Sequence, residues 1–275
     1  MHFEGTGYTD AGRVREINQD SYLVKIANTN LGQVALIAVA DGMGGLAEGE
    51  YASSVAIHTL ATWFDKQLPY ELQGLGGARA DFEKWATGQW RTLTDDINAK
   101  IKDYGKRKRI SLGTTLTAML VVNRRYSIVH IGDSRAYEIS EQAATQLTVD
   151  QTFVKREIDA GRMTPEEALV HPQRNVLLQC LGASDDMEPV IINGNVNQQA
   201  TYLICSDGFR HVLTSDELRA GLNPAVIGAY QRRGGFNSVP QAMESVLRQM
   251  TELVKERKER DNITSVLLCS SEATW

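Results

Sequence analysis

The sequence lacks several features that would each indicate a particular class of protein. Its 275 residues include only three cysteines, Cys180, Cys205 and Cys269, which lie far apart and mostly within apolar runs. This pattern predicts small buried thiols in a reducing, cytoplasmic environment, and it argues against a disulfide framework or a zinc site. We find no internal repeat, low-complexity tract or linker.

Membrane and nucleic-acid signals are missing as well. No apolar stretch approaches the roughly 18–20 residues that a membrane span needs, and the first residues lack the basic and apolar regions of a secretory signal. The net charge of −5 and the pI near 5.6 argue against nucleic-acid binding as the main function. We therefore expect a protein that binds neither membranes nor nucleic acid.

The overall composition is that of an ordinary globular protein. Hydrophobic residues make up 42% and charged residues 23% of the chain. A chain of this length can bury a substantial core as one or two domains. We predict a single domain over residues 1–275, with a small lobe of short helices and loops at about 150–186.

The most informative stretch is residues 35–45, where six apolar residues lead into Asp41-Gly42-Met43-Gly44-Gly45. The apolar run is short, partly β-branched and bounded by glycine, which predicts a buried strand that ends at Asp41. Glycines allow close approach of the backbone, including its carbonyl groups, to a ligand. A carboxylate beside such backbone suits a hard cation.

Local patterns predict a mixture of strands and helices. Alternating or continuous apolar runs predict the following strands: Thr6–Thr9, Ser21–Ile26, Gln33–Ala40, Thr115–Val122, Tyr126–Ile131, Arg135–Ile139, Pro189–Ile192, Tyr202–Cys205 and Ile263–Cys269. Helical spacing and capping signals predict the following helices: Glu50–Phe64, Arg79–Tyr104, Thr152–Ala160, a short helix that starts after Thr164, Ser215–Ala220 and Gln241–Glu256. A loop is predicted at 74–77. We expect an α+β sandwich whose helices cover its sheets.

Aspartates recur where these apolar runs end or begin. Asp41, Asp133 and Asp207 follow such runs, whereas Asp20 and Asp261 stand at the start of theirs. A single aspartate at a strand end is usually only a turn former. Five such placements predict a shared acidic site, whose carboxylates remain ionised only if cations neutralise them. Because the candidate ligands are oxygens, the metals should be Mg²⁺ or Mn²⁺, with Ca²⁺ as an alternative.

Six short motifs in order resemble the PP2C (PPM) family of metal-dependent protein serine/threonine phosphatases, in its compact bacterial form. The resemblance extends over roughly residues 5–269. The motifs are Arg15…Asn18-Gln19-Asp20, Asp41-Gly42-Met43-Gly44-Gly45, Gly113-Thr114-Thr115, Gly132-Asp133-Ser134-Arg135, Ser206-Asp207-Gly208 and Asp261-Asn262. The resemblance implies a four-layer αββα fold, in which a central sandwich of two mostly antiparallel sheets is flanked by pairs of helices.

The resemblance also implies roles for individual residues. Asp41 would bridge two metal ions and Gly42 would lend its carbonyl to one of them. Asp207 and Asp261 would complete the second metal, Asp20 would hold metal-bound waters, and Asp133 would support a third, weaker metal. Arg15 would bind the substrate phosphate, and the metal site would comprise Asp20, Asp41, Gly42, Asp133, Asp207 and Asp261.

The implied activity is hydrolysis of phosphoserine and phosphothreonine in proteins, which reverses Ser/Thr kinase signalling. A water or hydroxide that bridges two Mn²⁺ or Mg²⁺ ions would attack phosphorus directly, while Arg15 would supply a forked cation for the phosphate oxygens. The chain has no Cys-x₅-Arg signature that would supply a thiolate nucleophile. We expect a monomer that acts on phosphorylated proteins. The alternative is a catalytically weak regulatory or binding module of the same fold.

Two departures from the family pattern bear on the chemistry. Met43 stands where many eukaryotic members have a histidine that is a candidate general acid, so we expect a metal-bound water to protonate the leaving group. Gln19 stands where many members have Glu, which removes one charge from the surroundings of the metals. The histidines His58, His130 and His171 are interpreted as structural.

Two further segments carry predictions. The lobe at 150–186 resembles the flap of bacterial members, and its residues Arg174, Asn175 and Val176 are candidates for substrate contact. The basic run Lys106–Arg109 is interpreted as a solvated helix end or loop. Recruitment of an acidic partner by this run is the alternative.

Overall fold

The computed structural model describes residues 1–43, 48–75, 79–185 and 187–270. Within these ranges the strands form two five-stranded sheets in which every pairing of neighbours is antiparallel. The first sheet has the order β1-β10-β9-β6-β7: β1 Phe3–Asp10, β10 Ile263–Ser270, β9 Thr201–Cys205, β6 Arg135–Ile139 and β7 Ala144–Gln146. The second has the order β2-β3-β4-β5-β8: β2 Asp20–Thr29, β3 Gly32–Asp41, β4 Leu116–Val122, β5 Arg125–Ile131 and β8 Val190–Asn195.

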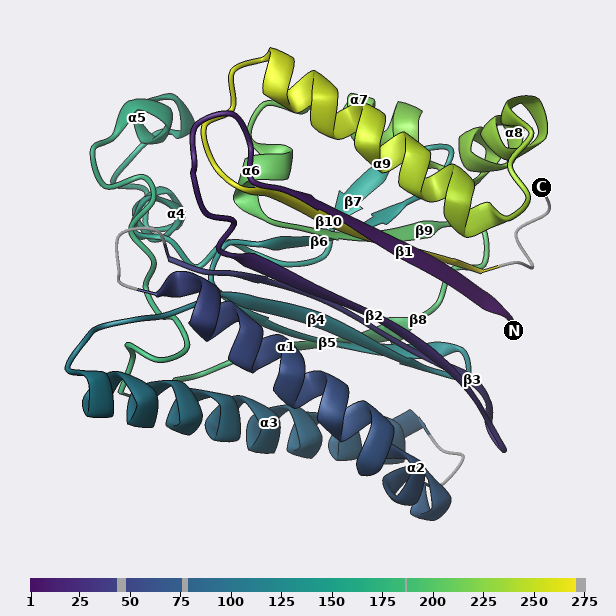
Figure 1. Cartoon of the computed structure of the whole chain (residues 1–275), viewed down its shortest axis with the longest axis horizontal. Helices are drawn as coiled ribbons and strands as arrows, with labels where there is room; N and C mark the ends of the chain where they lie inside the picture. Colours follow the sequence, from purple (N-terminus) through teal and green to yellow (C-terminus); the bar gives the residue numbers. More distant parts are fainter. Residues whose placement is uncertain (44–47, 76–78, 186, 271–275) are drawn as a thin grey trace.

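Helices cover the outer face of each sheet, so the molecule has four layers (Figure 1). On the second sheet lie α1 Gly49–Lys66, α2 Leu68–Glu71, the 3₁₀ helix η1 Leu72–Gly74 and α3 Arg79–Lys108. On the first sheet lie α6 Asp207–Arg210, α7 Ser215–Leu222, α8 Pro224–Gly234 and α9 Val239–Glu256. The predicted α+β sandwich is therefore confirmed.

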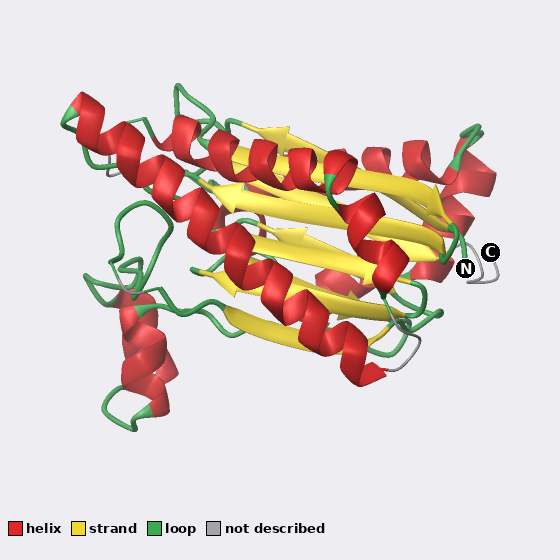
Figure 2. Ribbon diagram, turned by 90° about the horizontal axis from the view of Figure 1, so that it is seen from below, coloured by secondary structure: helices red, strands yellow, loops and turns green. Residues whose placement is uncertain are grey.

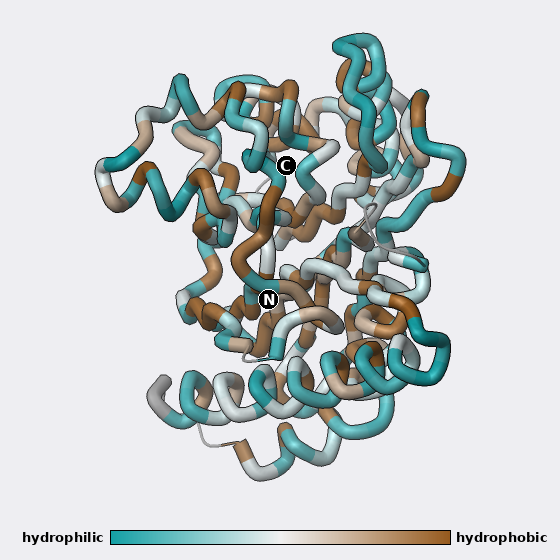
Figure 3. Tube along the Cα trace, turned by 90° about the vertical axis from the view of Figure 1, so that its left-hand side faces the viewer, coloured by the Kyte–Doolittle hydropathy of each residue, from teal (hydrophilic) through white to brown (hydrophobic). Residues whose placement is uncertain are grey.

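Three apolar clusters fill the spaces between these layers. One joins the second sheet to α1 and α3 through side chains such as Leu60 and Trp90. A second joins the first sheet to α7–α9 and includes Leu247, and the third, which includes Ile37 and Ile204, lies between the sheets. The hydropathy colouring follows this division, with brown strands in the interior and largely teal outer helices (Figure 3).

The two helices of the predicted lobe lie outside the sandwich, whereas Leu181, later in the same segment, is buried in the core beneath the second sheet. The lobe carries α4 Phe153–Asp159 and α5 Pro165–Val170, and in Figure 2 these helices stand apart from the layers, at one end of the strands. The helix α5 starts as the sequence predicts, because Thr164 caps it and forms a capping box with Glu167. Thr152 was predicted as the first residue of α4 and is instead its cap, since its side chain accepts from the Lys155 N–H.

Most predicted elements are present, with ends that differ by a few residues. Four short elements and one longer helix were not predicted: β7, α2, η1, α6 and α8. The prediction of a loop at 74–77 is wrong at its first residue, because Gly74 is the last residue of η1. This short helix is anchored by Leu72, which is buried in the core. Residues 76–77 of that loop, and Gly44 and Gly45, lie outside the described residues.

The helix α8 begins with an Asn223 cap and Pro224 at its first position, signals that the sequence contains. Among the helices of the described residues, none is long and apolar enough to span a bilayer.

Candidate metal centre

Two of the predicted carboxylates face each other across one strand pair. Asp20 opens β2 and Asp41 closes β3, and the antiparallel register places them directly opposite one another. Such partners have their Cβ atoms about 4.5–5.5 Å apart. The backbone of Asp41 is fixed by the two residues just before β4, because its N–H donates to the Thr115 hydroxyl at 3.0 Å and its carbonyl accepts from the Thr114 hydroxyl at 2.9 Å.

The other sheet contributes two more carboxylates at the same end of the sandwich. Asp207 follows β9 as the first residue of α6, and Asp261 stands two residues before β10. Because β9 and β10 are antiparallel neighbours, the end of one meets the start of the other. Asp133, just after β5, is the fifth carboxylate and is buried.

Burial and mutual repulsion raise the pKa values of these groups. Burial, with further repulsion from Asp207, raises the pKa of Asp20 and of Asp133 to about 7 each. Burial and the neighbouring Asp20 hold the pKa of Asp41 well above its usual range. The pKa of Asp207 is raised mainly by burial, and the nearby His211 and Arg210 oppose that rise.

These groups fit hard divalent cations. Both carboxylate oxygens of Asp20 are buried without a hydrogen-bond partner of normal geometry, although the hydroxyls of Thr264 and Ser206 lie near enough to offset part of its raised pKa. Uncompensated buried carboxylates are costly unless cations neutralise them. Within the described ranges, no three or more His, Cys, Asp or Glu side chains stand in an arrangement that could hold a metal ion as they lie, so cation binding would require these carboxylates to reorient.

Gly42 occupies a position that only glycine can fill. A Cβ atom built there would lie 2.4 Å from the Gly49 carbonyl oxygen and 2.5 Å from that of Gln19. The Gly42 N–H donates to the same Gln19 carbonyl at 3.1 Å. The strand end after Asp41 is therefore held against the start of α1 and the approach to β2, with bare backbone at the acidic cluster.

Arg15 reaches the acidic cluster from the loop between β1 and β2. Its Nε and Nη2 donate to the two oxygens of Asp261 at 3.0 and 2.9 Å. This forked hydrogen bond to Asp261 raises the pKa of Arg15, which remains a permanent cation. The side chain is 40% exposed, so it remains open to an anion from solvent.

Asn262 holds the loop that carries Arg15, which comprises residues 11–19 between β1 and β2 and is called the Arg15 loop below. Its Nδ2 donates to the carbonyls of Ala11 and Ile17 at 3.0 and 3.1 Å, and its Oδ1 accepts from the Gln19 N–H at 2.9 Å. The side chain is buried and ties both ends of the loop to the start of β10; Figure 1 shows these two segments side by side. The sequence motif contained Asn262, but its role was not predicted.

Replacing Asn262 by Ala should lower the free energy of unfolding by about 1–3 kcal/mol, because three backbone groups lose their partner. It should also lower kcat/KM for a phosphorylated substrate, because Arg15 loses its fixed position. Denaturant unfolding and steady-state kinetics measure the two effects. Asn237→Ala, at an exposed position in the turn before α9, is the matched control and should change neither.

A buried ion-pair network supports Asp133 and links it to the start of the lobe. Arg135 donates a hydrogen bond to each carboxylate oxygen of Asp150, both at 2.7 Å, and Arg210 donates to the same carboxylate at 3.3 Å. Arg210 also donates to the Asp133 carbonyl at 3.0 Å. Arg135 and Arg210 lower the pKa of Asp150 against the effect of burial, whereas burial raises the pKa of Asp133.

A cleft of about 980 Å³ opens beside this cluster and brings part of the predicted site together. Arg15, Asp133 and Asp261 line it, as do Arg174 and Asn175 from the lobe. Asp20, Asp41, Gly42 and Asp207 lie outside its lining, and so does Val176, which is exposed.

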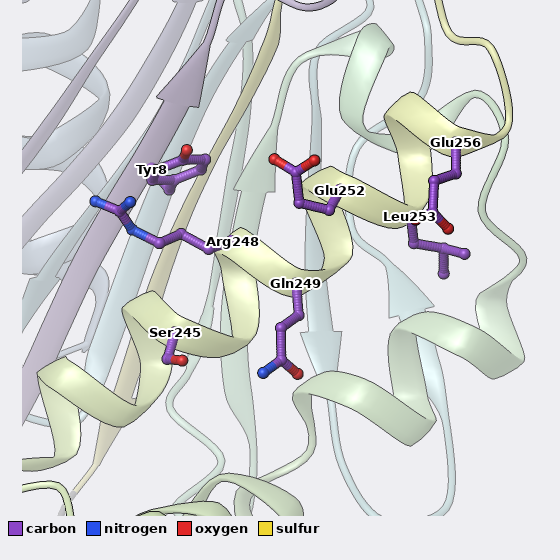
Figure 4. A pocket seen from close by; sticks show the side chains of 7 residues that line it. All are labelled: Tyr8, Ser245, Arg248, Gln249, Glu252, Leu253 and Glu256. Atoms are coloured by element: carbon purple, nitrogen blue, oxygen red, sulfur yellow. The ribbon is translucent and has the colours of Figure 1, made fainter.

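A second pocket, of about 410 Å³, lies against α9 and contains none of the predicted site residues. There the Arg248 guanidinium lies over the Tyr8 ring at 4.7 Å (Figure 4).

Met43 and Gln19, the two residues that depart from the family pattern, each form a hydrogen bond with a neighbouring residue. The Met43 N–H donates to the Gly113 carbonyl at 3.0 Å, and the Gln19 side chain donates to Glu50 at 3.2 Å.

His130 is buried within β5, where it contacts the Thr117 hydroxyl and the Val149 carbonyl, and burial lowers its pKa to about 4.

The raised pKa values predict that binding of divalent cations at this cluster would depend on pH. Between about pH 4 and pH 7 the folded cluster retains protons that the unfolded chain has lost, so the stability of the metal-free protein falls as the pH rises. Mn²⁺ competes with these protons. Its stabilisation should therefore grow from pH 5.5 to 7.5, by about 1.4 kcal/mol per pH unit for each proton released. Thermal unfolding with Mn²⁺ or with chelator measures this, and an equal shift at both pH values would contradict it.

The fold and the acidic cluster place this chain among α+β sandwich proteins that gather carboxylates from both sheets at one edge. More narrowly, the chain belongs to the protein phosphatase 2C family, whose sequence model matches residues 9–267. The predicted family is confirmed.

Comparisons with individual proteins agree with this assignment. The chain is 32% identical over 259 residues to the serine/threonine protein phosphatase PstP of Mycobacterium tuberculosis, covering 94% of this chain but only 43% of that protein. It is 29% identical to the protein phosphatase PhpP of Streptococcus pneumoniae, covering 86% of this chain and 95% of PhpP.

Two solved structures are similar over nearly their whole length. One is the crystal structure of a bacterial serine phosphatase, with a TM-score of 0.78, 27% identity and 97% of each chain covered. The other is the catalytic domain of PstP in complex with two manganese ions, with a TM-score of 0.67, 29% identity and 97% of each chain covered.

Proposed function

We propose that this chain hydrolyses phosphoserine and phosphothreonine in proteins, and so reverses the action of Ser/Thr kinases. The observation that carries the proposal is the group of carboxylates with raised pKa values, of which Asp20 and Asp133 are buried, beside the half-exposed cation Arg15. Relatives named as serine/threonine protein phosphatases support it.

Two divalent cations, Mn²⁺ or Mg²⁺, would supply Lewis-acid activation of the phosphoryl group and of the shared water that attacks it directly. Asp41 would bridge them, with Asp207, Asp261 and the Gly42 carbonyl as further ligands and Asp20 as a holder of ordered water. Asp133 would support a third, weaker site. The PstP catalytic domain with two manganese ions supports this number.

The residues of the chain itself have defined tasks in this reaction. Arg15 would bind the phosphate oxygens and orient the phosphorus toward the carboxylate cluster. If Asp261 held a cation, the Arg15 guanidinium would be free to contact the substrate phosphate instead. Asn262 would hold the Arg15 loop, and the Arg135–Asp150–Arg210 network would fix Asp133.

We further propose that residues 1–275 form one catalytic domain with the segment 150–186 as a flap beside the site. Arg174 and Asn175 in the cleft lining support this role for the flap. The three buried free thiols support a cytoplasmic location.

The test is hydrolysis of a phosphothreonine peptide and of an aryl phosphate with Mn²⁺, with Mg²⁺ and with chelator. We expect turnover with either cation and none with chelator. A well-folded protein with no metal-dependent turnover would overturn the enzyme assignment and favour the alternative, a binding module of the same fold.

A further inference from the structure

Exposed apolar side chains are frequent in the two segments that border the cleft, and two of them, Val14 and Leu169, line it. Nine large hydrophobic side chains are exposed among the described residues, and three of these, Tyr70, Val149 and Val190, lie elsewhere. The other six belong to the Arg15 loop or to the flap: Val14, Ile17, Leu169, Val170, Val176 and Leu178. Single exposed hydrophobic residues need no explanation, but a group of them beside a binding site indicates an interaction surface.

Part of this group forms the walls of the cleft itself. Val14, which is 52% exposed and adjacent to Arg15, lines it from the β1–β2 loop. The flap lines it with Val154 and Ile158 of α4 and with Leu169 of α5, which is 75% exposed. We call these four residues the apolar wall. The same cavity contains Arg15, Asp133 and Asp261, so the wall continues directly from the proposed phosphate site.

We propose that the apolar wall binds an apolar side chain that flanks the phosphorylated residue of the substrate protein. This inference rests on the proposed function and adds a sequence preference to it. A phosphoresidue would bind at Arg15 and the acidic cluster, and a leucine-like neighbour would contact Val14 and Leu169. Burial of such a neighbour removes apolar surface from water on both partners, which favours binding.

The charges on the cleft favour a phosphopeptide over a second copy of this chain as the occupant. Arg174, Lys258 and Arg260 line the cleft, and within the described part of the chain none of their side chains forms an ion pair with a carboxylate, although the Arg260 N–H donates to Glu259. These cations complement the negative charge of a phosphorylated segment. A second copy of this chain carries a net charge of −5 but offers no phosphate to Arg15.

The test uses two fluorescent peptides that carry a non-hydrolysable phosphonate analogue of phosphothreonine, flanked on both sides by Leu in one and by Asn in the other. Fluorescence anisotropy with Mn²⁺ gives their Kd values for the wild type, for Val14→Thr with Leu169→Asn, and for Val190→Thr. Val14 and Leu169 are exposed, so their replacement should leave the fold intact. Val190, on β8 and 43% exposed, is a matched control outside the cleft.

We expect the wild type and Val190→Thr to bind the Leu peptide about tenfold more tightly than the Asn peptide. In the double variant this ratio should fall below about twofold. Equal affinities in the wild type, or an unchanged ratio in the double variant, would overturn the proposal. A wild-type dimer in light scattering that becomes monomeric in the double variant would assign the wall to self-association and would also overturn it.

Failure of the proposed function is seen separately. Turnover of the corresponding phosphothreonine peptides with Mn²⁺ reports on hydrolysis, whereas the ratio of Kd values reports only on the apolar wall. A protein that shows the expected ratio without turnover would retain the wall as a binding site and lose the enzymatic assignment.

Discussion

Replacement of Asp41 by Asn is expected to lower the metal-dependent kcat/KM by at least about 1000-fold, equivalent to ~4 kcal/mol of barrier. Asn keeps the shape of the side chain but removes the charge that would bridge two cations. Asp41 lies opposite Asp20 at the ends of β2 and β3, so both proposed metals depend on it. Steady-state kinetics with a phosphothreonine peptide at saturating Mn²⁺ measures the loss.

The same variant should be at least as stable as the wild type without metal, because one member of a mutually repelling buried cluster becomes neutral. Chemical denaturation in chelator tests this and separates loss of chemistry from loss of folding. Asp65→Asn is the control, since Asp65 pairs with Lys25 on the surface, away from the cluster, and should change activity less than twofold. Full activity in Asp41→Asn would contradict the proposed metal centre.

Arg15→Ala is expected to lower kcat/KM about 100-fold and to weaken inhibition by inorganic phosphate to a similar extent, because the forked cation for the phosphate is lost. Arg15→Lys should recover only part of this, since an ammonium group cannot form two parallel hydrogen bonds. The Mn²⁺ concentration that gives half-maximal activity should not rise. It should fall slightly, because Arg15 no longer occupies Asp261.

Arg13→Ala provides the matched control, as an exposed arginine of the same loop that does not line the cleft. It should leave kcat/KM within about twofold, as surface substitutions usually do. If Arg13→Ala and Arg15→Ala had equal effects, the role of Arg15 would be general electrostatic attraction and not phosphate binding.

The acidic residues could be predicted from sequence because their signals are local. Each of Asp20, Asp41, Asp133 and Asp207 adjoins an apolar run that is long enough to identify a strand. Antiparallel strands then bring distant ends to the same edge of a sheet. The convergence of Asp20 with Asp41, however, depends on a register that the sequence alone does not determine.

The supporting residues could not be predicted in the same way. Asn262 acts on carbonyls about 250 residues away in sequence, at Ala11 and Ile17. In the sequence Asp150 resembles an ordinary loop residue, and only the structure shows that Arg135 and Arg210 both bind its carboxylate. Such contacts depend on tertiary packing, which leaves no periodic signal in the sequence.

The elements that were not predicted are of two kinds: some are too short to be recognised, and one, α8, carries a signal that was overlooked. The strand β7 has only three residues, and α6 has four, too few for a hydrophobic period to be recognised. The helix α8, by contrast, has a clear start signal at Asn223 and Pro224. The apolar wall could be recognised only from the structure, because only the fold brings Val14 and Leu169 to the same cleft.

The most direct test of the proposed metal centre is the number of Mn²⁺ ions that the chain binds, measured by equilibrium dialysis with metal analysis, in the wild type and in Asp41→Asn. We expect two ions per wild-type chain, with a third at higher Mn²⁺ concentration, and none bound tightly by the variant. Wild-type protein that binds no Mn²⁺, or a variant that binds as much as the wild type, would contradict it.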